Sequence, residues 1–340
     1  MGFISQPPQA GVASGIAASG VNAGTNVATL TPAVPTADGD IALIPKVNGA
    51  ILADVPDGTA IGGNKRGIRA VDWQSTRSTA AQVASGVSSV IGGGENNQAS
   101  GARATIAGGT GNTAGGADST VGGGTGNNCT SQHGTISGGS GNTGTATSGI
   151  VIAGGQGNQA ILGNYSTVGG GQSNVADALG ATVPGGIGAA TRLTEGRFSY
   201  SSFGSGGQAQ LSELVTKAIT ADATVTPLTV DATVPDPGNT CMLGNNSCNT
   251  FSVLVSARSS GGDAKGWKIE GVIKRGANAA ATALVGAPVV TVLGADAGAA
   301  AWTVAAVADT TRGSLEIDVT GAAATTIRWV ARISLSEVTF

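Results

Sequence analysis

Charged side chains are scarce in this 340-residue sequence. Lys and Arg number 17 and Asp and Glu number 20, so charged residues make up 11% of the chain, against about 25% in an average globular protein. With a net charge of −3, the chain has no electrostatic basis for binding nucleic acid or an anionic membrane. Lys, Glu and Leu are also too few to build many amphipathic helices, which excludes a typical α/β enzyme. We therefore expect an all-β, loop-rich chain without a nucleic-acid partner.

Long apolar runs are missing as well. No stretch reaches the roughly 18–20 apolar residues that a membrane helix needs, so we expect no membrane insertion. The first residues, MGFISQPPQAG, carry no positive charge and two early prolines, which is unlike a secretory signal peptide.

Residue types that carry catalysis and metal binding are equally rare. The chain has one histidine, His133, and three cysteines, Cys129, Cys241 and Cys248. His133 has no Ser-His-Asp or Cys-His partners in the sequence pattern, and no zinc-ligand spacing exists. We therefore predict neither an enzyme nor a metal or cofactor site. Cys241 and Cys248 bracket a short loop, and whether they form a disulfide stays open.

Glycine, by contrast, is abundant, with 58 residues, and much of it belongs to an internal repeat. The repeat reads aliphatic, any residue, Gly, Gly, two residues, Asn, any residue, small residue, with a period of 15 or 16. Seven copies of one pattern predict a solenoid of stacked coils over residues 81–200, each coil with two short strands and glycine corners. The aliphatic position, which we expect to form the core of this shaft, falls at Ile91, Ile106, Val121, Ile136, Ile152, Val168 and Val183.

One coil of this kind offers few large side chains to an interior. We therefore expect several chains to wrap together and to bury the aliphatic column on a shared axis, with a closed three-fold ring as the symmetry. The alternative is a wider monomeric β-helix. Asn, present in six of the seven copies, is expected to tolerate left-handed backbone and to bond along the stack.

The N-terminal region, residues 1–80, is predicted to be partly extended and to need a partner that orders it. Its one compact basic cluster holds Lys65, Arg66 and Arg69, close to Trp73. These four residues are our candidates for docking to another protein. The competing interpretation of the cluster is a solvated loop.

The C-terminal region, residues 206–340, loses the repeat and shows alternating strands separated by turns. Seven to nine strands predict a β-sandwich, with Trp267, Trp302 and Trp329 on apolar strand phases and so in its core. Binding residues concentrate on loops. The candidate receptor-binding residues are Ser260, Gly262, Asp263, Lys265, Asp296, Asp309 and Arg312.

The run from Gly67 to Gln74, GIRAVDWQ, followed by the GGxxN repeats and the final Trp302-to-Ala331 pattern, resembles fibre proteins of tailed bacteriophages. The repeat is also similar to the heads of trimeric autotransporter adhesins. The resemblance implies a homotrimer in the virion, made in the host cytoplasm. It further implies contacts with other virion proteins through the N-terminal region and with a host cell-surface glycan or protein through the tip.

The leading hypothesis from the sequence is thus a structural tail fibre without catalytic activity that attaches the virion to its host. Three alternatives stay open. A capsid head fibre or decoration protein would use the same parts. A tailspike that cuts surface polysaccharide would need a pair of acids that meet only in the fold. The third is binding of ice or another flat surface by a column of threonines, Thr105, Thr120, Thr135, Thr167 and Thr182.

Overall fold

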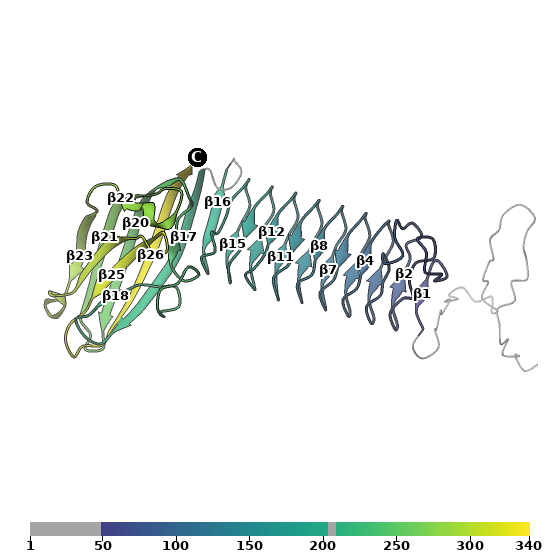
Figure 1. Ribbon diagram of the computed structural model, residues 1–340. Coiled ribbons are helices and arrows are strands. Elements are labelled where there is room, and N and C mark those ends of the chain that lie inside the picture. The colour runs from purple at the N-terminus through teal and green to yellow at the C-terminus, as the bar shows by residue number, and fades with distance from the viewer. Residues whose placement is uncertain (1–48, 203–208) are drawn as a thin grey trace, which may run out of the picture. The chain divides into compact units, whose positions relative to one another are not determined.

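The computed structural model describes residues 49–202 and 209–340. Most of the predicted N-terminal attachment region, residues 1–48, lies outside the described residues. The described chain is all-β apart from two 3-10 turns, η1 (Ala279–Ala281) and η2 (Ala297–Ala299). It consists of a β-solenoid followed by a β-sandwich (Figure 1).

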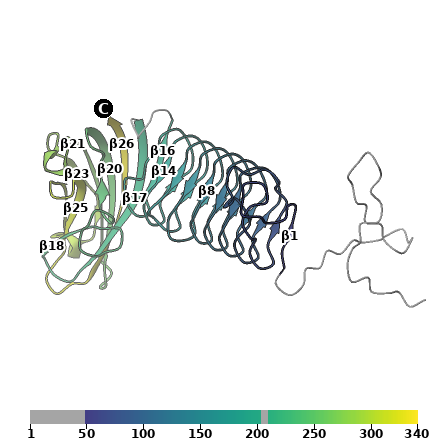
Figure 2. The ribbon, with the colours of Figure 1, turned by 45° about the vertical axis from the view of Figure 1, so that its right-hand side comes forward.

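Nine turns of the solenoid each contribute one two-residue strand to a parallel sheet. Its strands pair in register, coil upon coil, and the turned view in Figure 2 shows the coils stacked on one another. The solenoid thus starts before residue 81, where the repeat had placed it. The strands are β1 (Ile51–Leu52), β2 (Val71–Asp72), β3 (Val90–Ile91), β5 (Thr105–Ile106), β7 (Thr120–Val121), β9 (Thr135–Ile136), β11 (Val151–Ile152), β13 (Thr167–Val168) and β15 (Thr182–Val183).

A second parallel sheet of six strands forms another side of the same coils. Each of its strands places a polar residue or Val outward and a small residue inward, as the two-residue period of a strand requires. Its members are β4 (Gln98–Ala99), β6 (Thr113–Ala114), β8 (Asn128–Cys129), β10 (Thr143–Gly144), β12 (Gln159–Ala160) and β14 (Val175–Ala176).

The Gly-Gly corner has a steric cause. The second glycine of the pair is left-handed, as at Gly124 with φ +85°, and a Cβ there would lie 2.0 Å from the carbonyl oxygen of Gly139 in the next coil. The corner therefore needs Gly both for its backbone conformation and for coil spacing. The expectation that Asn takes left-handed backbone is wrong: the residue before it does, as at Gly126 with φ +65°.

The asparagines form a buried ladder along the axis. The backbone N–H of each Asn donates to the side-chain oxygen of the Asn one coil earlier, as from Asn127 to Asn112 at 3.0 Å. Each side-chain amide also donates to two glycine carbonyls. Gln74 accepts from the first Asn N–H, and the N–H of Ala189 closes the series at the other end. The predicted bonding along the stack is confirmed.

The predicted aliphatic column is buried, but inside one chain. Its seven residues, from Ile91 to Val183, have no exposed surface in the single chain, and they pack against the column of small residues that begins at Ala99. The prediction that several chains bury this column on a shared axis is therefore wrong. The physical reason is that one large and one small side chain per coil fill the narrow interior that the two strands enclose.

The sandwich holds eleven strands, one of them shared with the solenoid, and packs a larger sheet on a smaller one. The larger continues from β16 (Phe198–Ser201) through β17 (Ala209–Thr220), β26 (Ile327–Thr339), β20 (Ser247–Ser259) and β21 (Ala264–Arg275), with β22 (Thr282–Leu284) and β23 (Val289–Ala295) beside β21. The smaller holds β18 (Val225–Pro227), β19 (Cys241–Met242), β24 (Thr303–Asp309) and β25 (Ser314–Thr320).

The three predicted core tryptophans are buried between the sheets, each at most 2% exposed. Trp267 stacks on Trp329 with ring centroids 5.6 Å apart, and Trp302 lies 6.0 Å from the same ring. Aromatic contacts at these separations add to the burial of the core.

Within the described residues, solenoid and sandwich share a strand. β16 pairs in parallel with β15 of the solenoid and antiparallel with β17 of the sandwich, so one sixteen-stranded sheet spans both parts. A buried ion cluster lies at this junction. The carboxylate of Glu337 contacts the guanidiniums of Arg192 and Arg197, and Arg197 also donates to the carbonyl of Met242 at 2.7 Å.

Candidate functional site

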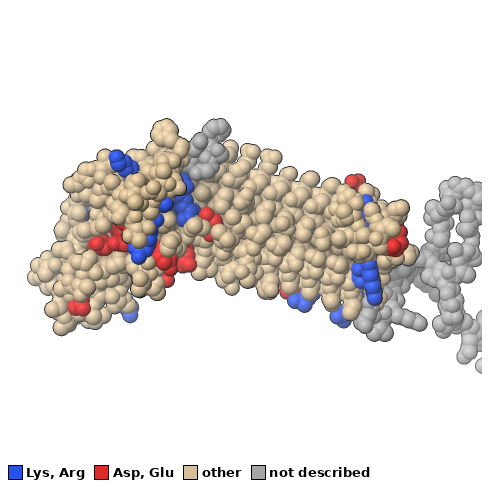
Figure 3. Space-filling model, viewed as in Figure 1, with Lys and Arg blue, Asp and Glu red and all other residues tan. Residues whose placement is uncertain are grey.

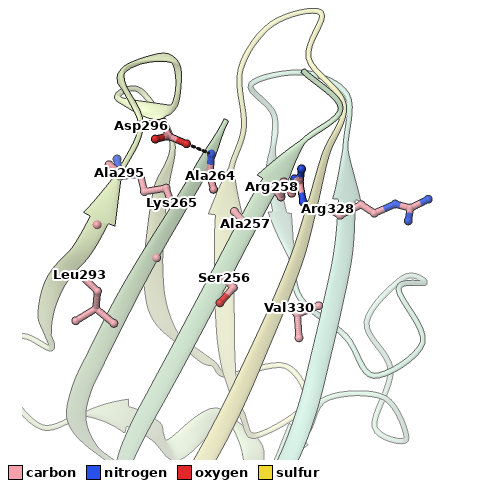
Figure 4. A pocket seen from close by; sticks show the side chains of 12 residues that line it. Ser256, Ala257, Arg258, Ala264, Lys265, Leu293, Ala295, Asp296, Arg328 and Val330 are labelled. Atoms are coloured by element: carbon pink, nitrogen blue, oxygen red, sulfur yellow. Dashed lines mark hydrogen bonds between the residues drawn. The ribbon is translucent and has the colours of Figure 1, made fainter. Parts of the chain in front are cut away.

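A groove of about 750 Å³ lies on the outward face of the larger sheet of the sandwich (Figure 4). It lies where β20 and β23 finish and where β21 and β26 begin. Gly266 and Gly294 face each other across β21 and β23, next to a β-bulge. A Cβ at Gly294 would meet no atom within 4 Å. The groove therefore exists because two facing glycines leave the sheet surface bare, and glycine within a strand often marks such close approach by a ligand.

Two arginines border this groove. Arg258 on β20 and Arg328 on β26 are direct partners in the antiparallel register, and both are exposed. Neither takes part in any ion pair or side-chain hydrogen bond found within residues 49–202 and 209–340. Like charges directly opposite each other destabilise a sheet. In Figure 4 the Arg328 side chain extends away from Arg258, which relieves that repulsion. Uncompensated cations at a groove favour an anionic ligand.

Two predicted receptor-binding residues also line this groove, but their charges are already engaged. The Lys265 ammonium donates to the carbonyls of Ala300 and Trp302, at 3.1 and 2.8 Å, and lies over the Trp267 ring. The Asp296 carboxylate accepts the N–H of Ala264 at 2.9 Å (Figure 4). These contacts fix the wall of the groove.

Three more candidates lie in the adjoining β20–β21 turn. Gly262 has φ +106°, a conformation that favours glycine, and Ser260 is exposed next to it. Asp263 is half-buried against Gly298. The structure thus brings five of the seven predicted receptor-binding residues to one end of the sandwich.

The remaining two, Asp309 and Arg312, lie at the other end. The Asp309 carboxylate accepts the backbone N–H groups of Thr311 and Arg312 and pairs with the Arg312 guanidinium at 2.9 Å. This turn contacts Arg275, the last residue of β21, whereas the groove lies at its first residues. Asp309 is therefore a turn-stabilising residue, and the structure does not join these two residues to the groove.

The predicted docking cluster is split in a similar way. Arg66 is buried, and its Nε donates to the Asp72 carboxylate at 2.8 Å, where Arg77 also approaches. The prediction that Arg66 is a surface contact is therefore wrong, because a buried cation needs an internal partner and Asp72 provides it. The ion pair lies inside the first coils of the solenoid. Lys65, Arg69 and Trp73 are exposed.

An acidic pair lies on the outward face of the smaller sheet. Glu316 and Asp318 alternate along β25, and their carboxyls share a hydrogen bond. Burial, together with the charges of Asp318 and Asp309, raises the pKa of Glu316 to about 7. Burial also raises the pKa of Asp318. A carboxylic acid that keeps its proton near neutral pH is suited to act as a general acid.

Sequence reasoning missed the groove arginines. Both occupy the outward positions of strands in which polar and apolar residues alternate, and this alternation was the only signal for them in the sequence. Their meeting depends on the register between β20 and β26, which lie far apart in the sequence. Among residues 49–202 and 209–340, no group of three or more His, Cys, Asp or Glu is placed to hold a metal ion. The same residues include no helix long and apolar enough to span a bilayer.

Comparison with solved structures finds similarity to phage tailspikes, of which two are described here. One is the tailspike protein gp49 of Acinetobacter baumannii bacteriophage Fri1, a capsular polysaccharide depolymerase, with 8% identity and a TM-score of 0.24 over 88% of this chain and 49% of that chain. The other is the tailspike protein of Acinetobacter phage vB_ApiP_P1, with 9% identity and a TM-score of 0.23 over 88% of this chain and 61% of that chain. No family model and no curated protein matches.

This chain therefore spans about half to three fifths of the length of those tailspikes. TM-scores of this size do not establish a shared function. The prediction that this chain is not an enzyme is nevertheless contradicted, because one of the two similar structures is a depolymerase, and we withdraw it.

Proposed function

We propose that this chain is a structural attachment protein of a bacteriophage tail, which acts as a homotrimer in the virion and binds an anionic saccharide of the host surface in the groove beside Arg258 and Arg328. The observation that carries the proposal is the pair of unpartnered arginines next to a hollow with a glycine floor. Leu293 and Val330 line the same groove and would pack against the C–H face of a sugar ring. Guanidinium groups bind carboxylate or phosphate in a bidentate manner.

Binding of purified host capsule or lipopolysaccharide to the full chain tests this proposal. Arg258→Gln and Arg328→Gln should each weaken binding about 10- to 100-fold, since a charge-assisted hydrogen bond contributes about 1.5–3 kcal/mol. Lys274→Gln is the matched control, because Lys274 is exposed on β21 away from the groove. Gly294→Leu, which fills the groove without changing its charge, should abolish binding.

The ligand class is tested with the same polysaccharide after chemical reduction of its carboxyl groups. Loss of binding to the reduced form supports an anionic ligand. Equal binding of both forms would contradict the role of the arginines. Failure of the native chain to bind any host glycan would refute the attachment function itself. Imaging of labelled particles separates a tail position from a position on the head.

The acidic pair on β25 favours a second candidate function, the hydrolysis of a surface polysaccharide. Glycosidic hydrolysis needs one carboxylic acid that protonates the leaving oxygen and one carboxylate that activates water or attacks the sugar. With its pKa of about 7, Glu316 keeps the proton that the first role requires. Asp318 takes the second role only when substrate binding parts the two hydrogen-bonded carboxyls, because a glycosidic bond is flanked by carboxyls about 5 Å or more apart. Release of oligosaccharides by the native chain, lost in Glu316→Gln and kept in Lys274→Gln, would support cleavage. Glycan binding without released fragments would refute it.

A further inference from the structure

The side of the solenoid formed by the nine-turn sheet carries an uncharged outward column. Seven successive coils place only Thr or Val on this face, half-buried or exposed, because their partners in each strand point inward. The charged groups of these coils lie elsewhere; Arg103 and Asp118, for example, pair with each other in the turns. The column, which we call the threonine face, comprises Val90, Thr105, Thr120, Thr135, Val151, Thr167 and Thr182.

The threonine face continues onto the first strand of the sandwich. Phe198 on β16 is the register partner of Thr182, so it is the next residue of the column, and it is 44% exposed. Tyr200 follows on the same strand, at 43% exposed. On the outward face of β17, three aliphatic side chains, each between 55% and 60% exposed, alternate with one acidic and one basic residue: Leu211, Glu213, Val215, Lys217 and Ile219. Five large apolar side chains exposed on two paired strands, with only two charges of opposite sign among them, mark an interaction surface.

The opposite sheet of the solenoid differs in chemistry. Its outward positions are mostly amides and threonines, among them Gln98, Asn128 and Gln159. Such groups keep water-bonded polar atoms exposed, and removing them from water without new partners costs free energy. Of the two sheets, the threonine face therefore has the smaller free-energy cost of removal from water. Figure 3 likewise shows the charged residues gathered at the first coils and beside the sandwich, with few along the solenoid between them.

We propose that the threonine face and its extension over β16 and β17 form the contact between copies of this chain in the homotrimer, on which this inference rests. A second copy fits because its own coils have the same axial spacing of about 4.8 Å, so side chains interdigitate at every coil. Seven coils extend over roughly 30 Å. With five half-exposed large side chains at one end, the patch is on the scale of the ~800 Å² per partner found in stable interfaces. The threonine face thus takes the role that the sequence predicts for the aliphatic column, because each chain buries that column within itself.

Native mass measurement of the full chain tests the assignment. Thr135→Lys with Val151→Lys places two cations on the threonine face. Thr143→Lys with Gln159→Lys is the matched control on the opposite face, in the same two coils and with corresponding exposure. The first pair should convert the oligomer to a 32.6 kDa monomer, while the control keeps the oligomer. An oligomer that survives the first pair, or is lost only in the second, would overturn the assignment.

A second measurement covers the case in which the charged pair fails to fold. Thr120→Cys and Thr113→Cys each add one thiol to the same part of the solenoid, on the threonine face and on the opposite face respectively. In the oligomer the Thr120→Cys thiol should react several-fold more slowly with an alkylating reagent, as mapped by peptide mass. Equal alkylation rates of the two thiols in an intact oligomer would show that the threonine face is not the contact between copies. If the native chain is monomeric, the homotrimer and this contact are both refuted, whereas the proposal of glycan binding is unaffected.

Discussion

The asparagine ladder permits a quantitative test through Asn127. Its side-chain amide donates to the carbonyls of Gly123 and Gly139, at 2.8 and 3.0 Å, and its oxygen accepts the backbone N–H of Asn142 at 3.0 Å. In Asn127→Ala the N–H of Asn142 stays buried without this acceptor, and both carbonyls lose a donor. The Gly139 carbonyl still accepts the N–H of Thr125, and Gly123 is partly exposed, so the unsatisfied N–H of Asn142 accounts for most of the loss. Buried unsatisfied groups cost about 1–3 kcal/mol each, and we expect about 2–5 kcal/mol in total.

Urea unfolding of the full chain, followed by circular dichroism, measures this loss. The neighbouring Asn128 is the matched control, because its side-chain oxygen has no hydrogen-bond partner and its side chain points outward from the coil. Asn128→Ala should change stability by no more than about 0.5 kcal/mol. Asn127→Asp should be at least as harmful as Asn127→Ala, since a carboxylate cannot donate to the two carbonyls. Equal stability of Asn127→Ala and Asn128→Ala would refute the argument that the ladder stabilises the solenoid.

Three further outcomes are expected. Glu337→Gln should lower the melting temperature strongly, because the fully buried Arg197 loses its counter-charge at a cost of about 3–5 kcal/mol, whereas Arg332→Gln, exposed on the same strand, should change it little. The folded-state pKa of Glu316 is about 7 against an ordinary 4.5, so the folded chain holds a proton that the unfolded chain releases; stability should fall as pH rises from 4.5 to 7 and fall less in Glu316→Gln. Only Cys248 should react quickly with a thiol reagent, because the other two cysteines are buried and burial raises their pKa to about 11; three equally fast thiols would contradict the fold.

The sequence predicts those parts of the fold that depend on local periodicity. The 15-residue spacing identifies the coil, and the alternation of Thr with Ile places the side chain of Ile106 inward. Periodicity does not say what the opposite wall of the interior is. The small residue Ala114 comes from the same chain, so the column needs no neighbouring copy.

The candidate site depends on contacts that no short pattern contains. Arg258 and Arg328 meet through strand register across 70 residues of sequence. Arg66 looks like a surface cation until Asp72 is seen beside it in the first coils. Asp309 and Asp263 are both acids in turns, yet one stabilises its own turn while the other adjoins the groove. A prediction from the residue types of loops therefore finds some residues that adjoin the groove and others that only stabilise a turn.

The continuous sheet through β16 has a mechanical consequence. Because β16 is joined by backbone hydrogen bonds to β15 of the solenoid and to β17 of the sandwich, a load applied to the sandwich passes into the coils as shear between neighbouring strands. Within the described residues, the sandwich can be pulled away from the coils through this sheet only by breaking the hydrogen bonds of β16.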